Sequence, residues 1–326
     1  MEDVIMFKWK KLGKVFDPTK VVNRDWINEF AQAPCVVEFD QYIRVYFSCR
    51  PKPDLKGRYV SYSSYVDLDK GNFFRIIDVA NKPILELGGL GAFDEFGTYP
   101  ASIIKDKERY IAYYGGWTRC ESVPFNVAIG CAVSKDEGKT FTKIGAGPVL
   151  SYSKDEPFIL SGPKIHKFND LFYLFYIAGR KWILIEGKPE PVYKIRMAIS
   201  KDGIGWEKHN QDLIEDVIGE DEAQASPDVT FSNGKYHMFF CYRESTDFRR
   251  NKNRTYRIGY ASSLDLKKWT RDDSKVGIDI SDEGWDSEMV AYPHIYKSKD
   301  KTYMFYLGNQ VGKYGFGVAE LQGELI

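Results

Sequence analysis

The chain has 326 residues, in which 46 Lys or Arg side chains balance 46 Asp or Glu, so its formal net charge is zero. A neutral chain has no overall field to attract nucleic acid or an anionic membrane, and no stretch approaches the ~20 apolar residues of a membrane span. We therefore expect neither a nucleic-acid nor a membrane partner. The first ten residues, MEDVIMFKWK, lack the basic flank and apolar run of a signal peptide, which predicts a cytoplasmic protein.

The cysteines indicate neither a disulfide framework nor a metal site. There are five of them, no two have C-x-x-C spacing, and most lie in apolar, strand-like runs. They are interpreted as small buried hydrophobic residues in a reducing compartment. We expect no bound metal on this evidence.

The predicted elements begin with a strand at 7–11 and continue as a repeat marked by proline. The marker prolines are 66, 63, 64 and 66 residues apart. Each is followed by a short strand, a polar turn, an aromatic-rich strand, a strand with small residues and, in four units, a strand led by an aromatic residue. The marker residues are Pro34, Pro100, Pro163, Pro227 and Pro293. In chain order the predicted strands are 35–39, 42–48, 58–66 and 73–77; 101–105, 109–115, 126–134 and 141–145; 164–168, 172–178, 194–200 and 206–210; 228–232, 236–242, 256–263 and 269–273; 294–298, 302–308 and 314–320.

This repeat predicts an all-β, five-bladed β-propeller, with four antiparallel strands in each blade and residues 1–326 in a single domain. The fifth unit lacks a fourth strand. The strand at 7–11 resembles the aromatic-led fourth strands of other units, so we expect the N-terminal strand to close the last blade. Closure of this kind removes an exposed sheet edge.

The chain resembles the five-bladed glycosidase superfamily, which includes glycoside hydrolase families 32, 43 and 130. The resemblance is carried by the five proline-marked inner strands and by S-K-D-G-x-x-W hairpins such as Ser200–Trp206. It implies an axial carbohydrate site with an Asp directly before the marker proline or a Glu two places before it. Neither place is acidic in any blade, so these catalytic carboxylates cannot be transferred to this sequence. The places directly before the proline hold Ala33, Tyr99, Gly162, Ser226 and Tyr292, and those two before it hold Gln32, Thr98, Ser161, Ala225 and Ala291.

Other carboxylates are candidates to replace them. Four glutamates lie five residues before their marker proline, and Asp286 lies close to the last of them; the four are Glu29, Glu95, Glu222 and Glu288. If the blades match, these groups converge at one mouth of the axis. Glu288 is the preferred catalytic residue, with Glu95 as a further candidate. The alternative is that each carboxylate is a solvated loop charge or bonds backbone N–H groups.

Charged residues also follow two marker prolines directly. Asp228 and His294 have the same offset as Lys164, so all three should face the axis. Asp228 is a third catalytic candidate and His294 a substrate-binding candidate; the alternative is that the three residues pair with one another. The resemblance to family 43, whose members often carry a central ion near the axis, leaves such an ion open.

A basic feature repeats at the end of the second strands. Arg50, Arg180 and Arg243 lie 16 or 17 residues after their marker proline, where they should reach the same face as the upstream glutamates. Guanidinium groups clustered there could bind phosphate or carboxylate in a fork; the alternative is ion pairing between blades. Tyr99, Tyr292 and Trp117 complete the predicted substrate-binding set, with Trp117 placed for stacking on a sugar ring.

No nucleotide-binding loop or serine-nucleophile elbow occurs, and no cofactor is expected other than inorganic phosphate. The favoured function is a glycoside hydrolase or glycan phosphorylase acting on an anionic or phosphorylated sugar. A phosphorylase uses phosphate as the nucleophile and needs only the acid. The alternatives are a non-catalytic glycan-binding or polysaccharide-biosynthesis protein, and a glycosyltransferase.

Overall fold

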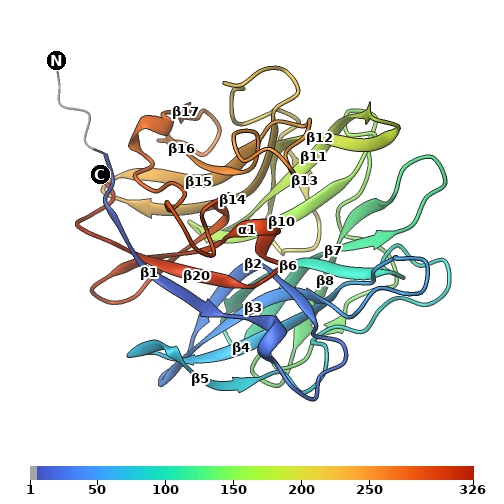
Figure 1. Cartoon of the computed structure of the whole chain (residues 1–326), viewed down its shortest axis with the longest axis horizontal. Coiled ribbons are helices and arrows are strands. Elements are labelled where there is room, and N and C mark those ends of the chain that lie inside the picture. Colours follow the sequence, from blue (N-terminus) through green and yellow to red (C-terminus); the bar gives the residue numbers. More distant parts are fainter. Residues whose placement is uncertain (1–5) are drawn as a thin grey trace.

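The computed structural model describes residues 6–326; the first five residues, on which part of the signal-peptide prediction rests, lie outside them. Its strands form five four-stranded antiparallel sheets that follow one another around a common axis (Figure 1). The predicted five-bladed propeller is therefore confirmed. Among the described residues, no helix has the length and apolar character needed to span a bilayer.

The blades run in chain order from an inner strand at the axis to an outer strand at the rim. Blade 1 contains β2 (Glu29–Glu38), β3 (Tyr42–Arg50), β4 (Tyr62–Asp69) and β5 (Asn72–Val79). Blade 2 contains β6 (Gly97–Asp106), β7 (Arg109–Thr118), β8 (Asn126–Ser134) and β9 (Thr142–Lys143). Blade 3 contains β10 (Leu160–Phe168), β11 (Leu171–Ile185), β12 (Lys188–Ser200) and β13 (Glu207–Lys208). Blade 4 contains β14 (Ala223–Ser232), β15 (Lys235–Arg243), β16 (Arg257–Ser263) and β17 (Thr270–Arg271).

The fifth blade joins the two ends of the chain. It contains β18 (Ala291–Lys297), β19 (Thr302–Leu307), β20 (Phe316–Leu321) and β1 (Trp9–Phe16), with β1 paired to β20 from Trp9↔Leu321 to Phe16↔Phe316. The predicted closure by the N-terminal strand is confirmed. Three short helices complete the fold: η1 (Pro18–Lys20), η2 (Asp273–Lys275) and α1 (Asn309–Gly312).

Aromatic side chains of the second strands fill the space between blades. Phe47 of β3 packs against Phe16 of β1 and Phe316 of β20, with ring centroids 4.9 and 6.2 Å apart. These contacts seal the junction between the first and last blades. All five cysteines are free, and four are buried; Cys120 is exposed.

Every inner strand is irregular at its marker proline. The register with the second strand shifts between Gln32 and Cys35, and a matching shift occurs in the other four blades. Four of the residues directly before the proline have positive φ: Ala33, Gly162, Ser226 and Tyr292. Residues before proline ordinarily avoid helical conformations, and non-glycine residues with positive φ are often found at functional sites. The five bulges thus mark one level of the axis as a place where backbone regularity is given up.

Candidate active site

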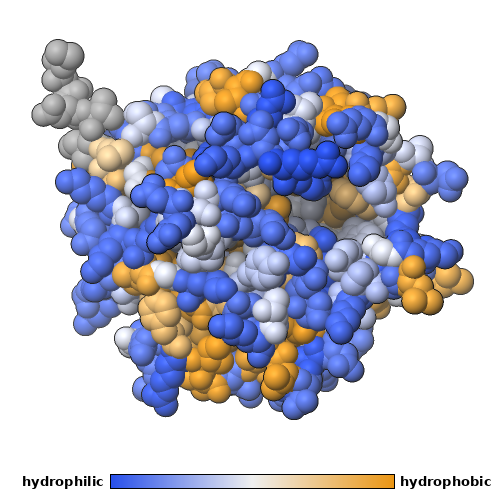
Figure 2. All heavy atoms as spheres, viewed as in Figure 1, coloured by the Kyte–Doolittle hydropathy of each residue, from blue (hydrophilic) through white to orange (hydrophobic). Residues whose placement is uncertain are grey.

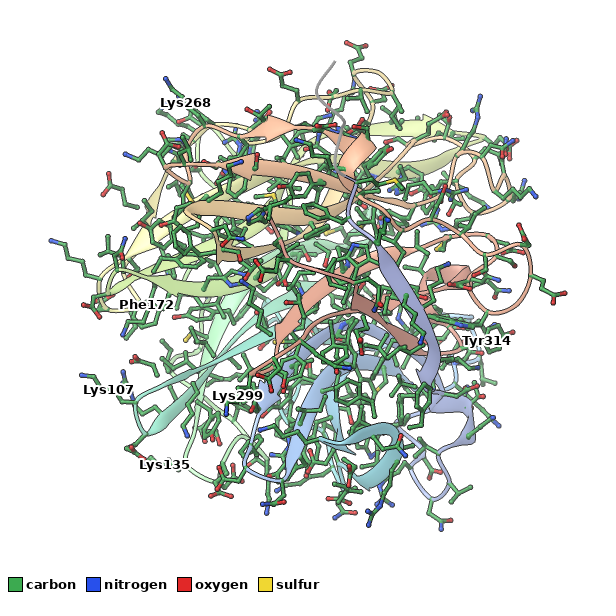
Figure 3. The ribbon with its side chains drawn as sticks, turned by 90° about the vertical axis from the view of Figure 1, so that its left-hand side faces the viewer. Lys107, Lys135, Phe172, Lys268, Lys299 and Tyr314 are labelled. Carbon is green, nitrogen blue, oxygen red and sulfur yellow. The ribbon has the colours of Figure 1, made fainter. Side chains whose placement is uncertain are left out.

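A cleft of about 1650 Å³ opens on the axis at the level of the marker prolines. It is lined by the starts of the inner strands, by α1 and by three long connections: 119–125, the β11–β12 hairpin and the 244–256 loop. Figure 2 shows a hollow near the middle of this face, bordered by many hydrophilic residues. The turns that follow the inner strands lie at the other end. In Figure 3, Lys107 and Lys299 of these turns lie on the side opposite to Tyr314.

The cleft is strongly basic. Nine Lys or Arg residues line it against three Glu, so a ligand with negative charge is favoured there. The basic residues are Arg50, Arg58, Arg119, Lys164, Lys188, Arg243, Arg249, Arg250 and Lys252, and the acidic ones are Glu121, Glu190 and Glu288.

Arg243 occupies the deep part of the cleft without a carboxylate partner. It is 2% exposed, and its guanidinium carbon lies 3.6 Å from the centre of the Phe248 ring. One terminal nitrogen donates to the Tyr193 hydroxyl at 3.3 Å and another to the Glu244 carbonyl at 2.9 Å, while Nε has no hydrogen-bond partner. A buried guanidinium with a free donor and no counter-ion is suited to accept an anion.

Arg50 has a similar environment in the first blade. Its guanidinium carbon lies 4.6 Å from the Phe30 ring, 5.3 Å from Tyr59 and 5.8 Å from Tyr99. Its Nε is buried and also lacks a partner. Within residues 6–326 neither Arg50 nor Arg243 forms an ion pair, so the predicted alternative of ion pairing between blades does not apply to these two.

Tyrosine hydroxyls lie beside the arginines. The Tyr193 and Tyr256 oxygens are 2.7 Å apart, and the Tyr256 and Tyr292 rings are 5.7 Å apart. Burial raises the pKa of Tyr256 and Tyr292 well above 10 and also raises the pKa of Tyr99, so these hydroxyls stay protonated at neutral pH. They can therefore donate hydrogen bonds to an anion or to sugar oxygens. Tyr99, Tyr292 and Trp117, all predicted from sequence, line the cleft.

Glu288 is exposed in the cleft, and its carboxylate forms no ion pair within the described residues. Its backbone is fixed, because its N–H donates to Asn309 Oδ1 at 2.8 Å and its carbonyl accepts from Arg257 at 3.1 Å. Of the other two lining glutamates, Glu190 pairs with Arg249 and Glu121 lies on the 119–125 loop. The carboxylate preferred from sequence is thus available for chemistry.

Glu222 and Asp286 do not line the cleft. Both belong to a buried ion pair that recurs in four blades and ties an acidic residue near the inner strand to a basic residue of the outer strand. Asp286 binds Lys11 at 2.8 Å and the Tyr306 hydroxyl at 2.9 Å, and Glu222 binds Arg271 at 2.6 Å. The same arrangement is made by Asp94 with Lys143 and Tyr114, and by Glu156 with Lys208 and Tyr176.

Sequence reasoning missed these pairs, although a signal was present. In each of the four blades the basic residue lies two positions after the aromatic residue that leads the outer strand; the four aromatic residues are Trp9, Phe141, Trp206 and Trp269.

Three further candidates lie outside the cleft lining. Glu29 accepts from the Tyr59 hydroxyl at 3.1 Å and is 3.5 Å from Lys313, so it supports a lining tyrosine. Glu95 accepts from the Gly91 N–H at 2.9 Å, as expected for a loop charge. Arg180 pairs with Asp212 at 2.6 Å. It lies 17 residues after its marker proline where Arg50 and Arg243 lie 16 after theirs, and one residue reverses the face of a strand.

Asp228 and His294 lie deeper along the axis, and they line a separate cavity of about 320 Å³ near the far end. Asp228 is 3.2 Å from His294 Nδ1 and 3.7 Å from Lys164 Nζ, so the three residues pair with one another. His294 Nε2 accepts the Val36 N–H at 2.9 Å, which places the remaining ring proton on the nitrogen that faces Asp228. No group of three or more His, Cys, Asp or Glu residues in 6–326 is arranged to hold a metal ion.

Comparison with known proteins places the chain in a family. It is 33% identical over 316 residues to the uncharacterized protein Rv1502 of Mycobacterium tuberculosis, an alignment that covers 96% of this chain and 99% of that protein. The chain belongs to the family of this mycobacterial protein. A β-1,2-mannobiose phosphorylase of Thermoanaerobacter is 30% identical over 141 residues, covering 39% of this chain and 44% of the phosphorylase. No protein-family model matches the chain.

Solved structures share the propeller at low sequence identity. A glycoside hydrolase superposes with a TM-score of 0.75 and 17% identity over 98% of this chain and 93% of its own. The β-1,2-mannobiose phosphorylase of Listeria innocua, solved with β-1,2-mannobiose, gives 0.69 and 14% over 96% of both chains. A thermostable family-43 glycoside hydrolase gives 0.62 and 14% over 92% and 90%. The family of Rv1502 therefore has the glycosidase-like five-bladed fold that the sequence predicted.

Proposed function

We propose that this chain is a carbohydrate-active enzyme that binds an anionic group in the axial cleft and cleaves glycosides by phosphorolysis. The observation that carries this proposal is the pair Arg50 and Arg243, both without a counter-ion, in a cleft that also contains the free carboxylate of Glu288. Hydrolytic glycosidases usually require two carboxylates, whereas a phosphorylase needs one acid and a bound phosphate. The similarity to mannobiose phosphorylases supports the same reaction.

In the proposed reaction, a phosphate oxygen held by the arginines attacks the anomeric carbon as the glycosidic C–O bond breaks. Glu288 in its acid form donates a proton to the leaving oxygen. The products are a sugar 1-phosphate and the shortened glycan. The hydroxyls of Tyr99, Tyr256 and Tyr292 contribute neutral donors to phosphate or sugar oxygens.

The test is an assay of aryl glycosides and β-linked mannobioses with and without inorganic phosphate, read as sugar 1-phosphate formed. We expect turnover only with phosphate, and a fall of about 100-fold in kcat for Glu288→Gln, the size of effect typical of a lost general acid. Glu121→Gln is the matched control, since Glu121 is the other lining glutamate without an ion pair in residues 6–326. Equal turnover with and without phosphate would refute phosphorolysis. A larger loss in Glu121→Gln would move the acid role to that residue.

One observation favours a second function, that of a non-catalytic glycan-binding protein. The inner strands carry no acid directly before or two places before the marker proline in any blade. Saturable binding of glycans without turnover under any of these conditions would establish this alternative.

A further inference from the structure

The basic residues at the outer edge of the cleft are not explained by a small ligand bound at Arg50 and Arg243. Lys188 lies on the β11–β12 hairpin, and Arg249, Arg250 and Lys252 lie on the 244–256 loop. We call these four residues the outer rim. The cleft is larger than the ~300–1,000 Å³ typical of small-molecule sites, so it has room for more than one sugar unit.

The backbone that carries the outer rim is held in place by many contacts. Within the 244–256 loop, Glu244 N–H donates to the Arg254 carbonyl at 3.2 Å and Asn251 N–H to the Asp247 carbonyl at 3.0 Å. Arg257 donates to the Lys252 carbonyl at 2.9 Å. Two ion pairs, Arg249–Glu190 and Arg250–Glu186, join the loop to the hairpin. Two segments from neighbouring blades thus form one wall.

Two charges of this wall are not neutralised. Lys188 and Lys252 are exposed, and neither has a carboxylate partner in the described part of the chain. The same loop also reaches the deep part of the cleft, because its Phe248 covers Arg243, whose Nε has no partner and which is 2% exposed. Unneutralised positive charge therefore extends from the buried arginine to the mouth of the cleft along one element.

We propose that the outer rim is a second anion-binding site, and that the substrate is a glycan chain with negative charges at more than one position. The proposal rests on the proposed function for the location of the reacting end at Arg243 and Glu288. One charged group of the chain would lie at the deep arginines, and a charged group of a following unit would lie between Lys188 and Lys252. A neutral glycan, or a sugar with a single charge, would leave the two lysines without a role.

A nucleic acid is a less suitable occupant. Proteins that bind single strands combine basic residues with exposed aromatic rings on which bases stack. The one aromatic ring of the loop's basic segment, Phe248, is 4% exposed and is covered by Arg243 and Arg249, at 3.6 and 4.2 Å. The net charge of zero also provides no general attraction to a polyanion.

The experiment compares binding of a heparin-derived hexasaccharide and the corresponding disaccharide, two probes that differ in the number of charged units. The full chain and the Lys188→Ala/Lys252→Ala variant are titrated by calorimetry at low and moderate salt. We expect the hexasaccharide to bind about tenfold more tightly than the disaccharide, the combined effect of a few exposed charge contacts. The variant should lose most of this difference and show a weaker salt dependence, since surface charge contacts are screened by salt.

The matched control is Lys267→Ala/Lys268→Ala, which removes two exposed charges of the same blade at the far end of the molecule. Lys268 lies on the side opposite to Tyr314 in Figure 3. Equal affinity for both probes, no binding of the hexasaccharide below about 1 mM, or an equal loss in the control variant would overturn the proposal. So would tighter binding of a thymidine oligonucleotide of equal charge. Because this readout uses no turnover, tight hexasaccharide binding without phosphorolysis would refute the reaction and leave the outer site supported.

Discussion

The guanidinium carbon of Arg243 lies 3.6 Å from the centre of the Phe248 ring, in a buried site where no carboxylate pairs with it. Arg44 is equally buried and lies 3.9 Å from the Tyr65 ring, but it donates two hydrogen bonds of 2.7 Å to Asp67. The two arginines thus have similar aromatic surroundings and opposite electrostatic ones. A buried charge without a counter-ion is costly to the fold, and such a cost is often retained for binding.

The contrast gives a first prediction. Arg243→Met should leave the free energy of unfolding unchanged or raise it, because an unneutralised buried charge is removed, and it should abolish binding of inorganic phosphate. Arg44→Met should lower the free energy of unfolding by about 3–5 kcal/mol, because it leaves Asp67 buried without its partner. Urea unfolding and phosphate titration of both variants provide the check. Destabilisation of Arg243→Met to the extent of Arg44→Met would show that Arg243 is a structural residue.

A second prediction separates the two glutamates that lie at the same offset from their proline. Glu222→Gln should lower the free energy of unfolding by about 3 kcal/mol, because Arg271 then loses a buried partner at 2.6 Å. Glu288→Gln should change it by less than about 0.5 kcal/mol, since Glu288 is exposed and forms no ion pair in 6–326. Denaturant titration measures both. A reversed order would contradict the assignment of Glu222 to the fold and Glu288 to the site.

This pair also shows what sequence could and could not predict. The propeller followed from the proline spacing and the strand pattern, because each blade is a local unit whose hydrophobic alternation is complete in the sequence. The site required residues with equal offsets to be equivalent in space, and they are not. Loop lengths and the bulges at the marker prolines differ between blades, so Glu222 and Glu288 share an offset and have different surroundings. The extra residue before Arg180 reverses its side in the same way.

The presence of counter-ions could not be read from the sequence at all. Arg50, Arg180 and Arg243 carry the same side chain at nearly the same place, yet only Arg180 meets a carboxylate, which comes from a segment 32 residues away. Which charges remain unneutralised depends on long-range contacts. The functional conclusion therefore rests on the structure, while the fold class did not need it.

A third prediction concerns pH. Burial lowers the pKa of His294 below 6.5, so below that pH the unfolded chain binds a proton that the folded chain does not. Stability should therefore fall as the pH drops from about 7 to 5, by at most ~1.4 kcal/mol per pH unit for each such group. His237, whose pKa is also lowered by burial, contributes in the same window. His294→Gln should remove about half of the decline, measured by urea unfolding at both pH values.

Asp228, beside His294, is expected to act in a lower window. Burial alone would raise its pKa, but His294 and Lys164 hold the pKa well below 3.8. The stability that this carboxylate contributes is present above about pH 4 and is lost as the pH falls further. An unchanged pH profile between 7 and 5 in His294→Gln would show that this imidazole is not neutral in the folded protein.

A fourth prediction tests how β1 closes the ring. Lys11 of this strand reaches Asp286 at 2.8 Å and Ser281 at 2.9 Å, and Asp286 also binds Tyr306 of β19, so one ammonium group joins the outer and inner parts of the last blade. Lys11→Met should lower the free energy of unfolding by about 3 kcal/mol, because Asp286 is 2% exposed and would lose its only ionic partner within residues 6–326. The neighbouring Lys10 is exposed, and Lys10→Met should change stability by less than about 0.5 kcal/mol. Because β1 and β20 also pair along their backbones, the loss in Lys11→Met should appear as a lower urea midpoint with an unchanged slope. Equal midpoints for the two variants would mean that backbone pairing alone closes the propeller.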